Sequence, residues 1–132
     1  MDNNNYTKQV MKHFRNPKNA GEIKNPNGIG KVGNPNCGDV LWIYLNVAKN
    51  KAKKDYIRNI KFKTMGCCAA ISSSDVICSL AKGKTLEDAG KITRKDILKE
   101  LGGLPLVKYH CSLLGEEALQ KAIKNYKEKN EK

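Results

Sequence analysis

The 132-residue chain lacks a long apolar run, contains few aromatic residues and has far fewer acidic than basic side chains. A membrane-spanning helix needs about 20 consecutive apolar residues, so no membrane partner is expected. Aromatic residues make up 6% of the chain, and 25 basic against 13 acidic residues give a formal net charge of +12. Few stacking aromatics and no recognisable reading module argue against nucleic-acid binding, despite this charge.

The cysteines form neither a disulfide framework nor a compact metal-binding loop. Their number is five, which is odd, and none of them stands at the C-x-x-C spacing of a zinc loop. Unpaired cysteines are typical of a reducing compartment. Because the start of the chain also resembles no secretory leader, we expect a cytoplasmic protein.

The length predicts one domain that spans residues 1–132, with a core large enough to form without disulfides. We expect disordered tails at 1–5 and 127–132. Alternating apolar residues predict a strand at 40–47, flanked by strands at 29–33 and 56–64. Adjacent antiparallel strands are the simplest pairing of these segments.

The remaining apolar pattern has helical spacing. It predicts an N-terminal helix at 6–14, a helix at 69–82 and a long C-terminal helix from near Ser112. Two N-cap pairs, Thr85 with Asp88 and Thr93 with Asp96, predict the starts of shorter helices between them. Strands first and helices after predict an α+β fold, in which about three antiparallel strands carry helices on one face.

Three cysteines fall at the ends of predicted elements. Cys37 precedes a strand, Cys67 lies between a strand and a helix, and Cys111 lies at the start of a helix. Helix N-termini stabilise negative charge, so Cys67 and Cys111 should favour the thiolate that binds metal or accepts sulfur. Asp39 and His110 stand close to these thiols in sequence and are harder ligands.

If the three segments meet, their thiolates with Asp39 or His110 could hold one zinc ion or a [2Fe–2S] cluster. The fourth ligand is left open between Asp39, His110 and Cys68. A harder donor in place of a thiolate weakens one bond to iron, as suits a metal that must later be released. Cys78, in the middle of a helix, has the pattern of a buried apolar residue. Cys68 is equally compatible with a buried neighbour and with a spare thiol.

The surroundings of these residues resemble one known family. The segments are NPNCGDV at 34–40, FKTMGCCAAISSS at 62–74 and LPLVKYHCS at 104–112. In this order they are similar to the iron–sulfur cluster scaffold family, which comprises the U-type scaffold of the ISC system and the N-terminal domain of the nitrogen-fixation scaffold. The resemblance runs from about residue 6 to residue 126.

This resemblance implies a scaffold, not an enzyme, that assembles a transient [2Fe–2S] cluster from iron and desulfurase-derived sulfur and transfers it to apo-proteins. Cys37, Cys67 and Cys111 would be cluster ligands and sulfur acceptors. Asp39 would be a labilising carboxylate and His110 an alternative ligand. Cys68 and Lys108 are accessory candidates, and zinc could occupy the same residues in the purified apo form.

The implied partners are a cysteine desulfurase, a frataxin-like iron regulator, a ferredoxin-type electron donor and recipient apo-proteins. An Hsp70-type chaperone is left open, because Leu106 replaces a proline of the family's chaperone motif. Cys68 also departs from the family, which usually has a small residue there. The chain could act as a monomer or as a homo-oligomer that shares a cluster. The alternative function is that of the SUF U-type branch, a zinc-bound sulfur acceptor for the desulfurase.

Overall fold

The computed structural model describes residues 6–34, 39–65, 68–104 and 109–130, and at 34, 39, 109–111 and 130 the backbone alone. Along the chain, the described residues form one helix, then three strands and then four helices. They are α1 (Lys8–Arg15), β1 (Gly28–Asn34), β2 (Asp39–Lys49), β3 (Asp55–Thr64), α2 (Cys68–Ala81), α3 (Leu86–Ala89), α4 (Arg94–Leu101) and α5 (Tyr109–Asn130).

The strands form one antiparallel sheet in the order β1-β2-β3. In the register, Asn34 lies opposite Asp39 and Leu41 lies opposite Thr64. A bulge between Asn46 and Val47 shifts the pairing of β2 with β3. Consequently β1 ends, β2 begins and β3 ends at one end of the sheet, which we call the site end.

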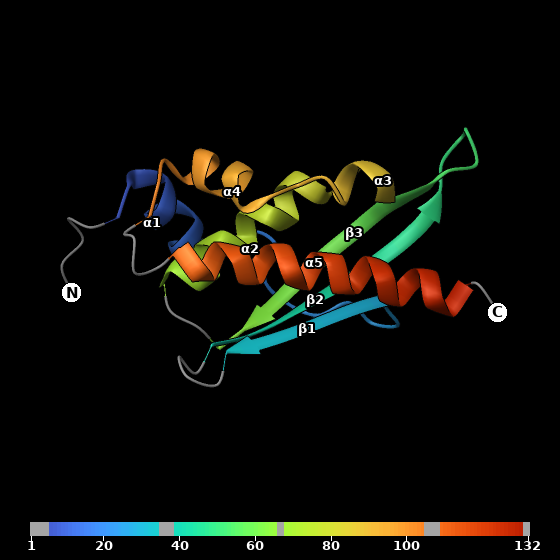
Figure 1. Ribbon diagram of the computed structural model, residues 1–132, viewed down its shortest axis with the longest axis horizontal. Coiled ribbons are helices and arrows are strands. Elements are labelled where there is room, and N and C mark those ends of the chain that lie inside the picture. The colour runs from blue at the N-terminus through green and yellow to red at the C-terminus, as the bar shows by residue number, and fades with distance from the viewer. Residues whose placement is uncertain (1–5, 35–38, 66–67, 105–108, 131–132) are drawn as a thin grey trace.

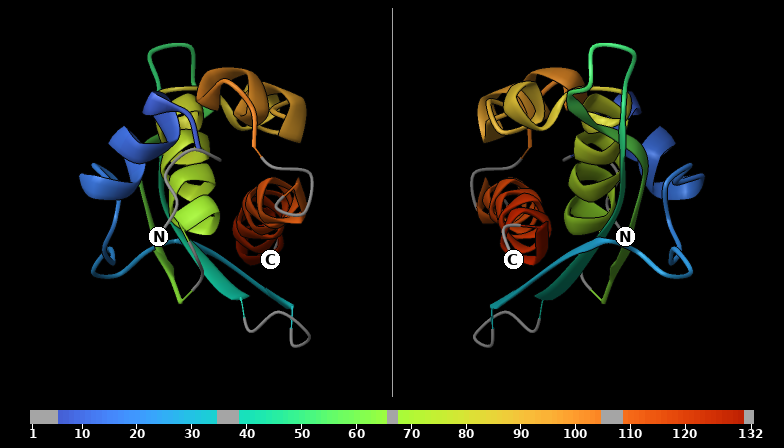
Figure 2. Two further views of the ribbon diagram at one scale, coloured as in Figure 1. Left: turned by 90° about the vertical axis from the view of Figure 1, so that its left-hand side faces the viewer. Right: turned by 90° about the vertical axis from the view of Figure 1, so that its right-hand side faces the viewer.

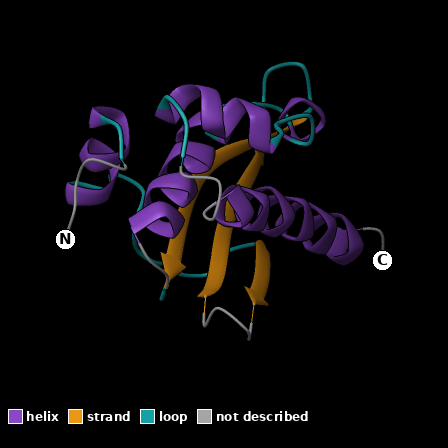
Figure 3. Ribbon diagram, turned by 60° about the vertical axis from the view of Figure 1, so that its left-hand side comes forward, coloured by secondary structure: helices purple, strands orange, loops and turns teal. Residues whose placement is uncertain are grey.

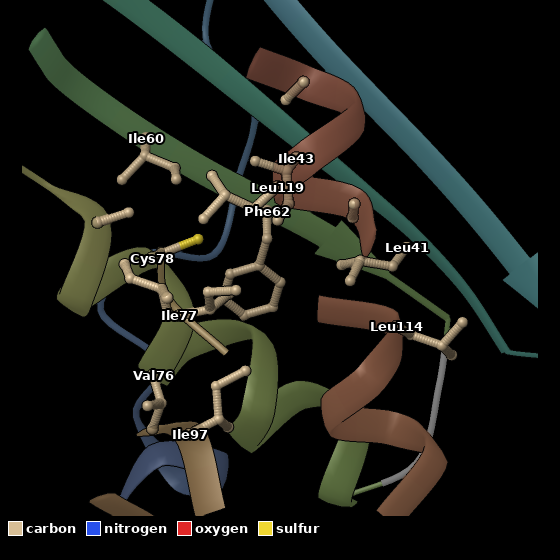
Figure 4. Packing of buried hydrophobic residues seen from close by; sticks show 14 of the residues in the cluster. Leu41, Ile43, Ile60, Phe62, Val76, Ile77, Cys78, Ile97, Leu114 and Leu119 are labelled. Atoms are coloured by element: carbon tan, nitrogen blue, oxygen red, sulfur yellow. The ribbon is translucent and has the colours of Figure 1, made fainter. Parts of the chain in front are cut away.

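The helices cover one face of the sheet (Figures 1 and 2). Their apolar side chains meet the inward-facing residues of the strands, among them Ile43, Leu45 and Ile60, which are fully buried. Figure 4 shows Phe62 of β3 close to Ile77 of α2 and Leu119 of α5. The other face of the sheet has no helix among the described elements (Figure 3).

Local sequence signals account for the helix boundaries. The Thr7 side chain accepts a hydrogen bond from the backbone N–H of Val10 and caps α1. Thr93 and Asp96 form a capping box at α4, and Gly102 ends that helix at φ 75°. A glycine tolerates this left-handed conformation without steric cost. At α3 the Thr85 hydroxyl accepts a hydrogen bond from the backbone N–H of Asp88, so both predicted N-cap pairs are confirmed.

The α+β fold and the one-sided helical layer are confirmed, and two boundaries of α5 differ from expectation. The helix begins at Tyr109, three residues before the predicted start near Ser112. It also continues to Asn130, where a disordered tail was predicted from residue 127. Residues 1–5 lie outside the described residues. No helix of the described chain is both long and apolar enough to cross a membrane.

Candidate functional site

Asp39 is the first residue of β2 and pairs through its backbone register with Asn34, the last residue of β1. This antiparallel pairing fixes the two strand ends that flank residues 35–38. Cys37 itself lies outside the described residues. The sequence position of Cys37 therefore belongs to the connection at the site end.

The end of β3 is tied to the beginning of β2. The Thr64 hydroxyl donates a hydrogen bond of 2.7 Å to the carbonyl oxygen of Val40, and the backbone N–H of Met65 donates one of 3.2 Å to the same oxygen. Cys68 then begins α2. Cys67 falls between Met65 and Cys68, outside the described residues. Met65, two residues before Cys67, is thus held next to the start of β2.

Helix α5 runs antiparallel to β1, which brings its N-terminus to the site end. A Cβ atom added to Gly28 would lie 3.1 Å from the Cβ of Tyr126, and one added to Gly30 would lie 2.1 Å from the carbonyl oxygen of Ala118. Later residues of β1 thus face earlier residues of α5. In Figure 1 the beginning of α5 lies on the side toward which the arrows of β1 and β3 point.

The first turn of α5 contains His110 and Cys111 in its backbone. Three described element ends therefore meet at one end of the sheet: the β1–β2 pairing, the β3-to-α2 passage and the start of α5. The side chains of Asp39, His110 and Cys111, and the whole of Lys108, lie outside what is described. Among the described side chains, no group of three His, Cys, Asp or Glu residues could hold a metal ion.

Two helix N-termini bracket this end of the molecule. Neither α2 nor α5 has an acidic residue in its first turn, so no acidic side chain there offsets the partial positive charge of the free backbone N–H groups. This charge favours anions at both helix starts. A thiolate at either start would be stabilised relative to a thiol.

Both cysteines whose side chains are described are buried, Cys78 within α2 and Cys68 at its start. Cys78 is fully buried in the core (Figure 4). Burial raises its pKa well above the ordinary value, and the nearby Asp75 adds to the rise. The prediction that Cys78 is a buried apolar residue is thus confirmed. Cys68 is also buried, with 8% exposure, and its carbonyl oxygen accepts a hydrogen bond of 2.8 Å from Ser72.

Sequence reasoning missed a buried polar cluster that joins α1 to α2. Asp75, in the middle of α2, is 1% exposed. Its Oδ2 lies 2.5 Å from His13 Nδ1, and its Oδ1 accepts a 2.9 Å hydrogen bond from the backbone N–H of Asn19. The Asn19 side chain also donates to Ser79, at 2.8 Å. The available signal was a lone acidic residue in a segment otherwise made up of small or apolar residues.

Comparisons with known proteins identify the class. The family model described as "NifU-like N terminal domain" matches residues 5–132. The chain belongs to the NifU-like N-terminal domain family.

Curated relatives cover nearly all of the chain. It is 49% identical to "Iron-sulfur cluster assembly scaffold protein IscU 1" of Archaeoglobus fulgidus, over 96% of this chain and 80% of that protein. It is 45% identical to "Iron-sulfur cluster assembly scaffold protein IscU" of Rickettsia prowazekii, over 96% of this chain and 95% of that protein. It also matches "Nitrogen fixation protein NifU" of Azotobacter chroococcum at 45% identity, over 92% of this chain and 38% of that longer protein.

Solved structures show the same fold. The N-terminal NifU-like protein from Brucella abortus superposes with a TM-score of 0.69 at 19% identity, over 96% of this chain and 97% of that one. A SUF-system scaffold protein from Fervidobacterium islandicum gives a TM-score of 0.68 at 21% identity, over 93% of this chain and 99% of that one. These likenesses confirm the predicted architecture.

Proposed function

We propose that this protein is a scaffold on which a [2Fe–2S] cluster is assembled as cargo and from which it passes to apo-proteins. The observation that carries the proposal is the meeting of three element ends at the site end, each next to one of Cys37, Cys67 and Cys111 in sequence. The curated relatives that this chain matches over most of their length are named as such scaffolds.

The three thiols would act as thiolates. Cys67 directly precedes α2 and Cys111 lies in the first turn of α5, where the positive ends of the helix dipoles favour a negatively charged sulfur. Three thiolates leave one ligand position of a [2Fe–2S] cluster to be filled. Asp39 or His110 would fill it, with Cys68 as the third candidate.

Sulfur would arrive as a persulfide. A thiolate of Cys37, Cys67 or Cys111 attacks the terminal sulfur of a desulfurase persulfide, a new S–S bond forms, and the old one breaks to leave the desulfurase thiolate. Converting the transferred sulfur to sulfide consumes two electrons, which a ferredoxin-type donor would supply. The scaffold therefore needs a partner that delivers sulfur and a partner that delivers electrons. A frataxin-like regulator would control the delivery of iron.

Release would depend on the ligand that is not a thiolate. A carboxylate or imidazole is a harder donor than a thiolate and binds iron less firmly in a sulfur-rich site. Asp39 lies at the start of a strand and His110 in a helix. A ligand from the strand and a ligand from the helix could therefore replace each other at the same coordination position. Such an exchange would open one iron to an incoming thiolate of the recipient.

The test is anaerobic reconstitution with iron, cysteine and a cysteine desulfurase, followed by transfer to an apo-ferredoxin. We expect a visible iron–sulfur spectrum of a [2Fe–2S] cluster and its appearance on the recipient. C37S, C67S and C111S should each abolish the stable cluster. The matched control is C78A, which removes a thiol buried in the core and should leave the spectrum unchanged.

A colourless protein with one tightly bound zinc ion and a persulfide, but no cluster, would contradict the proposal. That result would favour a zinc-bound sulfur acceptor instead. A cluster that survives all three serine substitutions would also contradict it, because the ligands would then lie elsewhere.

A further inference from the structure

The face of the sheet that the helices leave uncovered carries a basic and aromatic surface near the site end. In the strand register, Lys31 of β1 and Lys63 of β3 both lie opposite Trp42 of β2. Leu41 and Ile43, on either side of Trp42, are buried in the core. Successive side chains of a strand alternate between faces, so Trp42 points away from the helices. We call Lys31, Trp42 and Lys63 the lysine–tryptophan row.

The ammonium groups of both lysines of this row lie over the ring of Trp42. The ammonium nitrogens lie 5.3 Å (Lys31) and 5.9 Å (Lys63) from the ring centroid of Trp42. Each distance is typical of a cation–π contact. The two lysines reach the ring from strands on opposite sides of β2. A base would have to displace them in order to stack on Trp42, which disfavours a nucleic-acid ligand.

An internal carboxylate already pairs with this row. Glu22, from the segment between α1 and β1, accepts a 3.0 Å hydrogen bond from Lys63 Nζ. Both side chains are more than half exposed, at 59% and 54%, so this pair is exposed to solvent. Burial raises the pKa of neighbouring Tyr44, and Glu22 adds to that rise. The contact shows that the row accommodates a carboxylate, while the ammonium of Lys31 has no ion pair among the described residues.

Apolar surface adjoins the row on the side of the candidate site. Met65, which follows β3, is 73% exposed. A hollow of about 210 Å³ lies along the outer edge of β3, and its lining includes Pro17, Phe62 and Ile71. Lys63 lines this hollow as well as flanking Trp42. Charged groups therefore border a site that could receive an apolar side chain, as at the centre of a protein interface.

We propose that the lysine–tryptophan row, with Met65 and the adjoining hollow, docks an acidic partner protein beside the candidate site. Charge complementarity argues for this occupant, because the chain carries a net charge of +12 and positions two ammonium groups around one ring. Carboxylates of the partner would meet Lys31 and Lys63, and an apolar side chain would enter the hollow. The position next to Met65 and Thr64 brings the partner to the site end. The role of the partner, to deliver electrons or receive the cluster, rests on the proposed function.

The test uses a gallium-substituted plant-type ferredoxin, an acidic protein without the colour and paramagnetism of iron. It is titrated into the ¹⁵N-labelled chain at low salt, and NMR shifts are followed. Trp42 is the one tryptophan in the sequence, so its indole N–H signal reports directly on the row. We expect this signal and those of β1 and β3 near it to shift, with an affinity that falls as salt rises.

A charge-matched pair of variants locates the contact. K31E/K63E should weaken binding by at least about tenfold, because two attractive charges become repulsive. K51E/K54E makes the same change in net charge at exposed lysines of the β2–β3 turn, at the opposite end of the sheet, and should change affinity less than about twofold.

Absence of binding at low salt, or equal weakening by both double variants, would overturn the proposal. A stronger response of the Trp42 signal to single-stranded oligo-dT than to ferredoxin would replace the acidic protein with nucleic acid. Chemical reconstitution of K31E/K63E with iron and sulfide separates the two proposals, because it needs no partner. A normal cluster in this variant would leave the scaffold function standing whatever the docking result.

Discussion

At the scale of single residues, Asp39 is both a proposed ligand and the first residue of a strand. It begins β2 opposite Asn34, and its neighbour Val40 accepts two hydrogen bonds from the end of β3. The backbone around Asp39 is therefore fixed by both neighbouring strands. The ligand exchange proposed for Asp39 would therefore need no movement of the sheet.

Replacing Asp39 with alanine should slow release of the cluster. Without the harder ligand, exchange with an incoming thiolate loses its easiest step, and we expect transfer to apo-ferredoxin to be about tenfold slower, or about 1.4 kcal/mol in the barrier. The measurement is the transfer rate by visible circular dichroism. Glu117→Ala, at an exposed position of α5, is the control, and equal rates for D39A and the native chain would remove Asp39 from this role.

The buried thiol of Cys78 should make stability depend on alkaline pH. Its pKa is raised by burial from an ordinary value of 9.0, so the folded state holds the proton that the unfolded state loses. The stability associated with this thiol is complete below the unfolded pKa, declines as pH rises above about 9, and is fully lost once pH passes the folded pKa. Denaturant unfolding at pH 8 to 11 should show a steeper decline for the native chain than for C78A. Parallel declines would contradict this assignment.

At the scale of elements, the approach of β1 to α5 decides where the first turn of α5 lies. Gly30 leaves no room for a side chain, since an added Cβ would lie 2.1 Å from the carbonyl oxygen of Ala118 and 2.5 Å from the backbone nitrogen of Ala122. The obstacles are backbone atoms, which cannot turn aside. Any larger residue must therefore push the helix from the sheet.

Gly30→Ala should destabilise the fold by about 2–4 kcal/mol, because overpacking against backbone forces the two elements apart. The same displacement should reduce cluster yield, since α5 carries His110 and Cys111. Gly115→Ala is the control: its added Cβ would lie 3.6 Å from the nearest atom, a methyl group of Ile77, and alanine favours the helix by up to about 1 kcal/mol. Chemical denaturation of both variants checks the difference, and equal effects would show that the close approach does not matter.

The cluster of His13, Asn19 and Asp75 should hold α1 against α2. His13→Ala removes one partner of a carboxylate that is 1% exposed, and we expect a loss of about 1–3 kcal/mol. Lys12→Ala, at the exposed neighbouring position, should change stability by less than about 0.5 kcal/mol. Hydrogen exchange should show faster opening of α1 in H13A alone, and unchanged exchange would contradict the structural role.

Local patterns were sufficient to predict the strands, the caps and most helices. Alternating apolar residues fixed the inward face of β2, and threonine caps fixed α3 and α4. The start of α5 was missed because Tyr109, His110 and Cys111 carry no apolar helical period, so the helix became visible only from Ser112 onward. Propensity is a weak prior, which tertiary packing regularly overrides.

The candidate site was predictable only in its sequence positions. Cys37, Cys67 and Cys111 were chosen because they flank predicted elements, but the meeting of the element ends beside them depends on α5 crossing β1 in one direction. That direction follows from Gly28 and Gly30 fitting under Ala118 and Ala122, a relation between residues far apart in the chain. The lysine–tryptophan row likewise requires the strand register, which periodicity alone does not specify.

At the scale of the whole molecule, the candidate ligands belong to three separate parts of the chain. A metal ion held by all three would close long loops and be bound by the folded state alone. At a free zinc concentration about 100 times the dissociation constant, the folded state would gain about 2.7 kcal/mol.

Zinc should therefore raise the midpoint of thermal unfolding by an amount on the order of 10 °C. C111S should lose most of this rise, whereas C78A should keep it because its thiol lies in the core. Differential scanning calorimetry with and without zinc provides the measurement. An equal rise in C111S and the native chain would place the bound zinc outside the proposed ligand set.

The site end and the opposite end of the sheet form two different poles of the molecule. The exposed turn at 51–54 joins β2 to β3 opposite the site end, and the last turn of α5 also lies away from that end (Figure 1). A tether attached at this turn, or a surface linkage through the end of α5, would leave the other pole facing the solution. The antiparallel arrangement thus provides natural attachment points for single-molecule experiments in which partners must reach the candidate site freely.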